Sequence, residues 1–240
     1  QRQMCIRDRA SMTKIMTALL TIENLPDLNE TITVPEDIFE ELTAQDASVA
    51  GFNPYEQPTV RDLLYGVLLP SGADACETLA RAVGGSEEGF VAMMNQKAEE
   101  LGLTNTHFEN CTGLHNDNHY STCRDIAVLM SECLKSDTFR EIVTREVYTT
   151  EATASHPEGI TLYDTMLHRF TSYEMSTTLE NGAVIEGGKT GFTDEAGQCL
   201  VSFAEYGGEE YILVTAEAMT DSGSAVDSIA DASTVYGRLQ

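Results

Sequence analysis

Apolar residues recur at helical spacing through much of the first part of the chain. The first such segment has a broad apolar surface made of Ile15, Met16, Leu19, Leu20 and Ile22. The same periodicity predicts helices over residues 11–24, 60–68, 73–83, 87–101 and 124–134. Proline cannot continue a helix, so Pro26 stops the first of these helices and Pro70 follows the second.

The pattern changes at about Asn181. Short runs rich in β-forming residues predict strands over 183–185, 198–204 and 210–216. Gly207 and Gly208 supply a hairpin turn between the last two strands, and a closing helix is expected over 225–239. This order of elements indicates an α+β fold, in which a mostly helical subregion, about 25–180, is inserted between parts of a sheet-and-helix layer.

Length and composition indicate a globular protein able to bury a core. The chain has 240 residues, of which 42% are hydrophobic and 22% charged. We find no internal repeat, low-complexity tract or Ser/Gly linker, which argues against two tethered units. The formal charge of −25 argues against nucleic acid as a partner, because phosphate binding depends on Lys and Arg. The acidic pair Glu87-Glu88 is interpreted as part of a solvated helix face.

Residues 1–9 differ from the rest of the chain. They fit no amphipathic pattern and no signal peptide, and they hold three of the 14 basic residues. We interpret them as a non-native or artefactual leader, which leaves 10–240 as one domain. The sequence has no apolar run of the roughly 18 residues that a membrane span needs, so membrane contact would require segments absent from this chain.

The cysteines and histidines suggest no metal site. Six cysteines occur at irregular spacings without a C-x-x-C pair. We interpret them as buried small hydrophobic residues, or as including one disulfide such as Cys111 with Cys123. His115 and His119 are four residues apart, but the polar loop around Asp117 does not place them on one helix face.

Candidate chemistry begins at Ser11-Met12-Thr13-Lys14, where the first helix starts. Residues three apart lie on one helix face, so Ser11 and Lys14 can come within hydrogen-bonding reach. A serine hydroxyl is a weak nucleophile that needs an adjacent base. A lysine can be that base if burial, a nearby cation and the helix N-terminus lower its pKa. The alternative is a serine N-cap followed by a solvated lysine.

A second candidate motif, Lys189-Thr190-Gly191, lies far downstream. On a strand edge, Lys189 and the Thr190 hydroxyl would hold a substrate carboxylate, and Gly191 would let the backbone approach closely. Lys189 would also bring a second positive charge to the serine–lysine pair. The alternative is a β-turn flanked by Gly187-Gly188.

These two motifs belong to a longer series in the same order along the chain. The further members are Asp62-Leu63-Leu64-Tyr65-Gly66, Ser71-Gly72 with Asp74-Ala75, Met94-Asn95, Leu101-Gly102-Leu103, Asn110 with Gly113-Leu114, Tyr120-Ser121-Thr122 with Arg124-Asp125, and Phe192-Thr193 with Ala196-Gly197. S-x-x-K, a middle S-D-N and K-T-G are shared by penicillin-binding proteins and class A β-lactamases. From Ala10 onwards the chain resembles the low-molecular-weight penicillin-binding proteins, the serine D-alanyl-D-alanine carboxypeptidases of peptidase family S11.

The resemblance implies a β-lactamase/DD-peptidase-like α+β fold, with an antiparallel sheet flanked by helices and incomplete at the N-terminus. Residues 10–240 would form a DD-peptidase (transpeptidase-like) catalytic domain. Ser11 would be the acyl-enzyme nucleophile, Lys14 its base, and Ser71 a proton relay to the leaving group.

The resemblance also assigns the substrate contacts. Lys189, Thr190 and Gly191 would bind the substrate, with the carboxylate held by the first two. The backbone N–H groups of Ser11 and Phe192 would form the oxyanion hole, which needs two preorganised donors. No cofactor and no metal are implied.

Two departures from the family pattern stand out. The middle motif usually ends in asparagine, but this chain has Ala73, which makes no side-chain hydrogen bond. Asp74 does not replace it, because the next residue on a helix lies about 100° further round. Relatives also carry an export signal, a helix and sheet strands before the nucleophile, whereas here only Ala10 and the leader precede Ser11.

The predicted function is that of a serine-type D-alanyl-D-alanine carboxypeptidase that trims peptidoglycan stem peptides and binds β-lactam antibiotics. Such chemistry belongs outside the cytoplasmic membrane, in the cell envelope or secreted. Two alternatives remain open: a non-catalytic peptidoglycan- or penicillin-binding module, and a β-lactamase. A β-lactamase needs a glutamate that activates the deacylating water, and no convincing loop of that kind lies between Tyr120 and Lys189.

Overall fold

The computed structural model describes residues 10–218 and 226–240. A 3₁₀ turn, η1 (Ala10–Thr13), leads into the first helix. The helices are α1 (Lys14–Asn24), α2 (Ile38–Ala44), α3 (Val60–Leu68), α4 (Ala73–Gly84), α5 (Glu87–Glu100), α6 (Cys123–Cys133), α7 (Asp137–Val143), α8 (Leu167–Ser172) and α9 (Asp227–Tyr236). The strands are β1 (Val147–Thr149), β2 (Thr161–Tyr163), β3 (Val184–Thr193), β4 (Gly197–Tyr206) and β5 (Glu209–Ala218).

The strongly periodic helices match their predictions. Helix α3 has the predicted bounds, and α4, α5 and α6 agree to within one residue at each end. Local capping explains this accuracy. Thr59 and Asp62 form a reciprocal capping box at the start of α3, and Ser86 and Thr122 accept backbone N–H bonds at the starts of α5 and α6.

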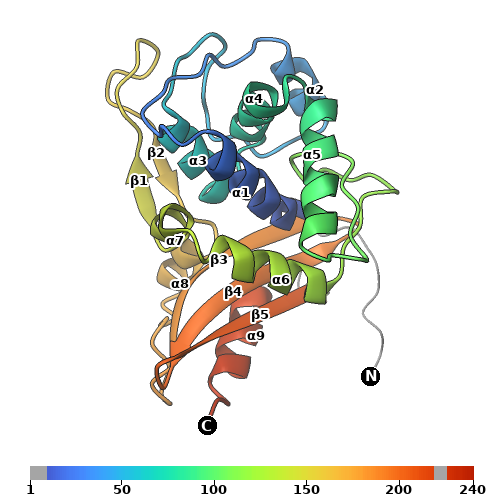
Figure 1. The fold of residues 1–240 in the computed structure, drawn as a ribbon. Coiled ribbons are helices and arrows are strands. Elements are labelled where there is room, and N and C mark those ends of the chain that lie inside the picture. The colour runs from blue at the N-terminus through green and yellow to red at the C-terminus, as the bar shows by residue number, and fades with distance from the viewer. Residues whose placement is uncertain (1–9, 219–225) are drawn as a thin grey trace.

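The sheet consists of three antiparallel strands in the order β3-β4-β5. Along β4, Cys199, Val201 and Phe203 pack into the core formed with the helical region, and Leu200 and Ala204 pack into a second cluster with α8 and α9. Successive strand residues point to opposite faces, so this alternation buries both faces. Figure 1 shows the sheet crossing the lower half of the molecule, with α6 over it and the helices α1 to α5 above.

The predicted hairpin turn between β4 and β5 is present. Gly207 and Gly208 have φ values of +64° and +83°, the left-handed conformations that a tight two-residue hairpin requires. Helix α9 agrees with the predicted closing helix, although position 225 lies outside the described residues. The subregion 25–180 contains the helices α2 to α8 and also the short β1–β2 hairpin, which the sequence analysis did not predict.

The cysteines of the described segments fit the first of their two interpretations. Cys76, Cys111, Cys123 and Cys133 have free thiols, and all but the half-buried Cys123 are buried. Cys199 is also buried. The suggested pairing of Cys111 with Cys123 is therefore wrong, because the Cys111 thiol instead donates to Glu77 Oε1 at 3.3 Å. Within residues 10–218 and 226–240, every helix is too short or too polar to cross a membrane.

Candidate active site

Ser11 and Lys14 come together where η1 passes into α1. Lys14 Nζ donates to Ser11 Oγ at 3.0 Å and to the Thr112 carbonyl oxygen at 2.5 Å. The first contact follows from the spacing of three residues, because the side chains share one face of the turn. The second contact joins Lys14 to a residue 98 positions away. The lysine is thus held in place by the tertiary fold and is not solvated.

Burial decides the protonation behaviour of Lys14. Its side chain is only 3% exposed. Loss of solvation lowers the pKa of Lys14, while the Cys76, Cys111 and Asp74 groups act in the opposite direction. Ser11 itself is only partly buried, so a substrate can reach it. A buried lysine beside an accessible serine is the arrangement that serine activation by an amine requires.

Asn110 stabilises the turn that places the Thr112 carbonyl beside Lys14. Asn110 Oδ1 accepts from the backbone N–H groups of Thr112 and Gly113, at 3.2 and 2.7 Å, and its amide donates to the Leu114 carbonyl at 2.8 Å. Gly113 has φ +79°, and a Cβ at this position would lie 2.0 Å from the Ala10 carbonyl oxygen. Glycine is therefore required where this turn, residues 110–114, approaches η1.

His119 fixes the start of the first helix from another direction. The Glu109 N–H donates to His119 Nδ1 at 3.3 Å, so the other ring nitrogen, Nε2, donates to Thr13 Oγ1 at 2.8 Å. His115 lies instead near the surface, with Nε2 3.5 Å from Asp117 Oδ1. The two histidines therefore have different surroundings, and His119 serves to position the segment that carries the serine.

Lys189 lies in β3, against η1, and is 1% exposed. Its Nζ donates to the Thr190 carbonyl at 3.1 Å. Burial and the positive charge of Lys14 lower the pKa of Lys189, while the buried Asp164 carboxylate opposes this change. The alternative of a β-turn at this motif is wrong, because Lys189 and Thr190 pair with Val201 and Leu200 in the sheet.

One threonine links β3 to the turn that carries Ser71. The Thr165 and Thr190 hydroxyls are 2.6 Å apart, and the Thr165 N–H donates to the Leu69 carbonyl at 3.1 Å. Leu69 is two residues before Ser71 in the α3–α4 connection. Thr165 therefore ties the predicted carboxylate contact to the predicted proton relay, a role that the sequence analysis did not identify.

Ser71 combines two unfavourable features. Its φ of +68° lies in the left-handed region that residues other than glycine rarely adopt. Its Oγ is buried and has no hydrogen-bond partner among the residues that the structure describes. Strain and an unsatisfied polar atom at one residue are characteristic of a functional position, where the surrounding fold maintains them at a cost in stability.

Asp74 does not take over the role of the missing asparagine. Its carboxylate accepts from the backbone N–H groups of Ala50, Gly51 and Phe52 at 2.7, 3.0 and 3.1 Å. These contacts bind the Asp74 carboxylate to the segment 50–52. Ala73, the first residue of α4, is buried and offers only its backbone N–H, which donates to the Ser48 carbonyl at 2.7 Å.

Gly191 and Phe192 continue β3 towards its end. Gly191 is buried and pairs with Cys199, whereas Phe192 pairs with Gln198 and has a side chain that is 56% exposed. In an antiparallel ladder, alternate residues direct their N–H groups away from the neighbouring strand. The backbone contribution of Phe192 to an oxyanion hole stays a prediction, as does that of Ser11.

Comparison with known sequences gives a consistent result. The pattern of the peptidase S11 family, described as D-alanyl-D-alanine carboxypeptidase, matches residues 2–220. The chain is 35% identical over 212 residues to D-alanyl-D-alanine carboxypeptidase DacF of Bacillus subtilis, covering 88% of this chain and 51% of that protein. It is 36% identical over 214 residues to a D-alanyl-D-alanine carboxypeptidase of a Streptomyces strain, covering 86% of this chain and 71% of that protein. The chain thus spans about half the length of the Bacillus relative.

Solved structures show the same fold. The crystal structure of the Streptomyces K15 DD-transpeptidase superposes with a TM-score of 0.81 at 32% identity, covering 98% of this chain and 88% of that one. A D-alanyl-D-alanine carboxypeptidase from Mycobacterium tuberculosis superposes with a TM-score of 0.80 at 27% identity, covering 98% of this chain and 83% of that one. The expected α+β, DD-peptidase-like fold is therefore confirmed.

Proposed function

The chain belongs to the peptidase S11 family of D-alanyl-D-alanine carboxypeptidases, and we propose that it removes the terminal D-alanine from peptidoglycan stem peptides through an acyl-enzyme on Ser11. The observation that carries this proposal is the 3.0 Å contact between Ser11 Oγ and the Nζ of the buried Lys14. Peptide cleavage requires an activated nucleophile, and these two side chains form the unit that can supply one.

In the proposed mechanism, neutral Lys14 takes the hydroxyl proton as Ser11 Oγ attacks the carbonyl carbon of the penultimate D-alanine. The backbone N–H groups of Ser11 and Phe192 stabilise the oxyanion. The C–N bond to the terminal D-alanine then breaks as Ser71 donates its hydroxyl proton to the leaving amine and takes up the proton held by Lys14, which leaves Lys14 neutral again. Water attacks the resulting ester with Lys14 as base, which releases the shortened peptide and restores the Ser11 hydroxyl.

Lys189 and Thr190 bind the terminal carboxylate in this proposal. Lys189 is buried in β3, with only 1% of its surface exposed. Burial and the positive charge of Lys14 lower the pKa of Lys189. An incoming carboxylate would offset both effects, because an opposite charge favours the protonated lysine. Gly191 leaves room for the substrate backbone beside the strand. β-Lactams would acylate Ser11 in the same orientation, and the natural substrate places the activity outside the cytoplasmic membrane.

The decisive experiment is intact-protein mass spectrometry after incubation with a penicillin. The chain should gain one equivalent of penicillin mass, and neither Ser11→Ala nor Lys14→Ala should gain it. D-Alanine release from a peptide ending in D-alanyl-D-alanine is measured in parallel, with circular dichroism to show that each variant is folded.

The possible results separate the three candidate functions. A lasting adduct together with D-alanine release supports the carboxypeptidase. An adduct that is lost quickly, with continuous turnover of penicillin, would identify a β-lactamase. A folded chain that forms no adduct and releases no D-alanine would be a non-catalytic binding module, and the proposal would be wrong.

A further inference from the structure

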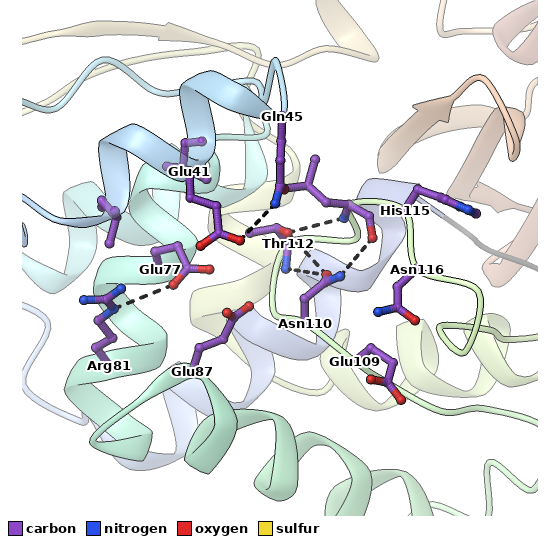
Figure 2. A pocket seen from close by; sticks show the side chains of 13 residues that line it. Glu41, Gln45, Glu77, Arg81, Glu87, Glu109, Asn110, Thr112, His115 and Asn116 are labelled. Atoms are coloured by element: carbon purple, nitrogen blue, oxygen red, sulfur yellow. Dashed lines mark hydrogen bonds and ion pairs between the residues drawn. The ribbon is translucent and has the colours of Figure 1, made fainter.

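A pocket of about 210 Å³ lies beside the turn 110–114, which holds Lys14 (Figure 2). Its walls come from α2, α4, α5 and the segment 109–116. Glu77 of α4 and Glu87 of α5 point into it, and Asn110 and Thr112 form part of the opposite wall. The proposed catalytic groups Ser11 and Lys14 do not line this pocket.

The two glutamates hold one residue of the turn between them. The Cys111 N–H donates to Glu87 Oε1 at 3.3 Å, and the Cys111 thiol donates to Glu77 Oε1 at 3.3 Å. The Cys111 carbonyl accepts from Thr17 Oγ1 at 2.6 Å, which ties the same residue to α1. Cys111 directly precedes Thr112, the residue whose carbonyl meets Lys14. The interpretation of Glu87 as a solvated residue is therefore wrong.

The two carboxyl groups lie close enough to influence each other. Oxygens of Glu77 and Glu87 and the Cys111 sulfur all lie within 4.8 Å of one another. Burial first, and then the charge of Glu87 and a hydrogen bond to it, raise the pKa of Glu77 to about 8. Each of the three groups already has a protein partner, so hydrogen bonding accounts for the cluster without a bound cation.

The charged groups around the pair do little to stabilise two negative charges. Arg81 Nε lies 3.8 Å from Glu77, but its Nη1 is engaged by Asp37 at 2.7 Å. The remaining titratable residues that line the pocket are Glu41 from α2 together with Glu109 and His115 from the segment 109–116. Most of these neighbours are acidic, so they disfavour a second negative charge on the pair.

We propose that Glu77 and Glu87 are positioning residues that act through Cys111 on Lys14. By sharing one proton, Glu77 and Glu87 hold the turn 110–114 in place, so that the Thr112 carbonyl stays in contact with Lys14. This inference rests on the proposed function of Ser11 and Lys14. When the shared proton is lost at alkaline pH, the two carboxylates repel each other and the turn loosens, so acylation slows although Lys14 is then more fully neutral.

The test measures the rate constant of acylation by a fluorescent penicillin between pH 6.5 and 9.5, together with the dissociation constant of the non-covalent complex. Glu77→Gln keeps a neutral hydrogen-bond donor at every pH, and it should abolish the alkaline fall, which we expect to be about threefold in the parent chain. Glu87→Ala should lower the acylation rate constant about threefold to tenfold at pH 7 with an unchanged dissociation constant. Glu99→Gln, an exposed change on the same helix, is the matched control and should follow the parent.

The outcomes distinguish the inference from the function on which it rests. A folded parent chain that forms no adduct would overturn both. If the parent is acylated but Glu77→Gln has the same pH profile, the inference alone is wrong. Should Glu87→Ala fail to fold, as judged by circular dichroism, the comparison of Glu77→Gln with Glu99→Gln still decides the question, because both replace one carboxylate by an amide.

Discussion

Replacing Ser71 by alanine should make the protein more stable and less active. The Ser71 hydroxyl is buried and unpartnered within the described part of the chain. Leaving such a group unsatisfied costs about 1–3 kcal/mol, and the small packing loss on its removal offsets only part of this. We therefore expect Ser71→Ala to raise the free energy of unfolding by about 1–2 kcal/mol.

The corresponding change in melting temperature is measurable. For a domain of this size, 1 kcal/mol shifts Tm by about 2–4 °C, so Ser71→Ala should raise Tm by about 2–8 °C. Ser71→Gly also relieves the left-handed φ of +68°, but the extra freedom of glycine in the unfolded chain largely cancels that gain. The two variants should therefore have similar stabilities. Acylation by penicillin should slow by a factor of about 10²–10⁴ if Ser71 transfers a proton.

Ser202→Ala is the matched control. Ser202 is also buried, but its Oγ lies 3.1 Å from the Tyr236 hydroxyl, so removal of the Ser202 hydroxyl should destabilise the fold by about 1 kcal/mol. Scanning calorimetry and chemical denaturation measure both variants under the same conditions. If Ser71→Ala is destabilised as much as Ser202→Ala, the Ser71 hydroxyl has a partner in solution and the reasoning from strain and burial is refuted.

Three further predictions concern the surroundings of the serine–lysine pair. Lys189→Met removes a positive charge that opposes the protonation of Lys14, so the pKa of Lys14 should rise. The ascending limb of the acylation pH profile should then move to higher pH, and an unshifted limb would contradict an electrostatic interaction between the two lysines. Gly113→Ala places a Cβ 2.0 Å from the Ala10 carbonyl oxygen, so less than about a tenth of the acylation rate should remain in a chain whose circular dichroism is still helical. Asp74→Ala leaves four backbone N–H groups without their acceptor and should lower the free energy of unfolding by about 2–4 kcal/mol, measured by urea denaturation; a smaller loss would mean that water replaces the carboxylate.

The sequence allowed the longer elements to be predicted because their information is local. Helix α3 has both an apolar periodicity and a capping box, and the β4–β5 hairpin is marked by Gly207 and Gly208. The seven-residue helices α2 and α7 and the three-residue strands β1 and β2 are too short to display a period, so they were missed. Their position is set by tertiary contacts such as the Tyr148 hydroxyl bond to Asp62 at 2.9 Å.

In the candidate site, too, contacts set by local sequence could be predicted, whereas contacts set by the tertiary fold could not. The contact of Ser11 with Lys14 follows from a spacing within one helical turn, and it could be predicted. The contact of Lys14 with the Thr112 carbonyl could not be predicted, because a backbone atom has no sequence signature. This carbonyl also belongs to a residue 98 positions away from Lys14. Glu87 was misjudged for a related reason. An acidic residue in the first turn of a helix usually faces water, and only the packing of α4 beside α5 brings it to Cys111.

In the proposed mechanism, the burial of Lys14 means that Ser11 becomes an activated nucleophile only when the chain folds. In an unfolded or half-folded chain, this lysine is an ordinary solvated ammonium, and Ser11 is an ordinary alcohol. The pKa of Lys14 falls only when the turn 110–114 packs against it, and the proposed base function depends on that fall. For the same reason, an active-site titration with a β-lactam would count correctly folded molecules rather than total protein.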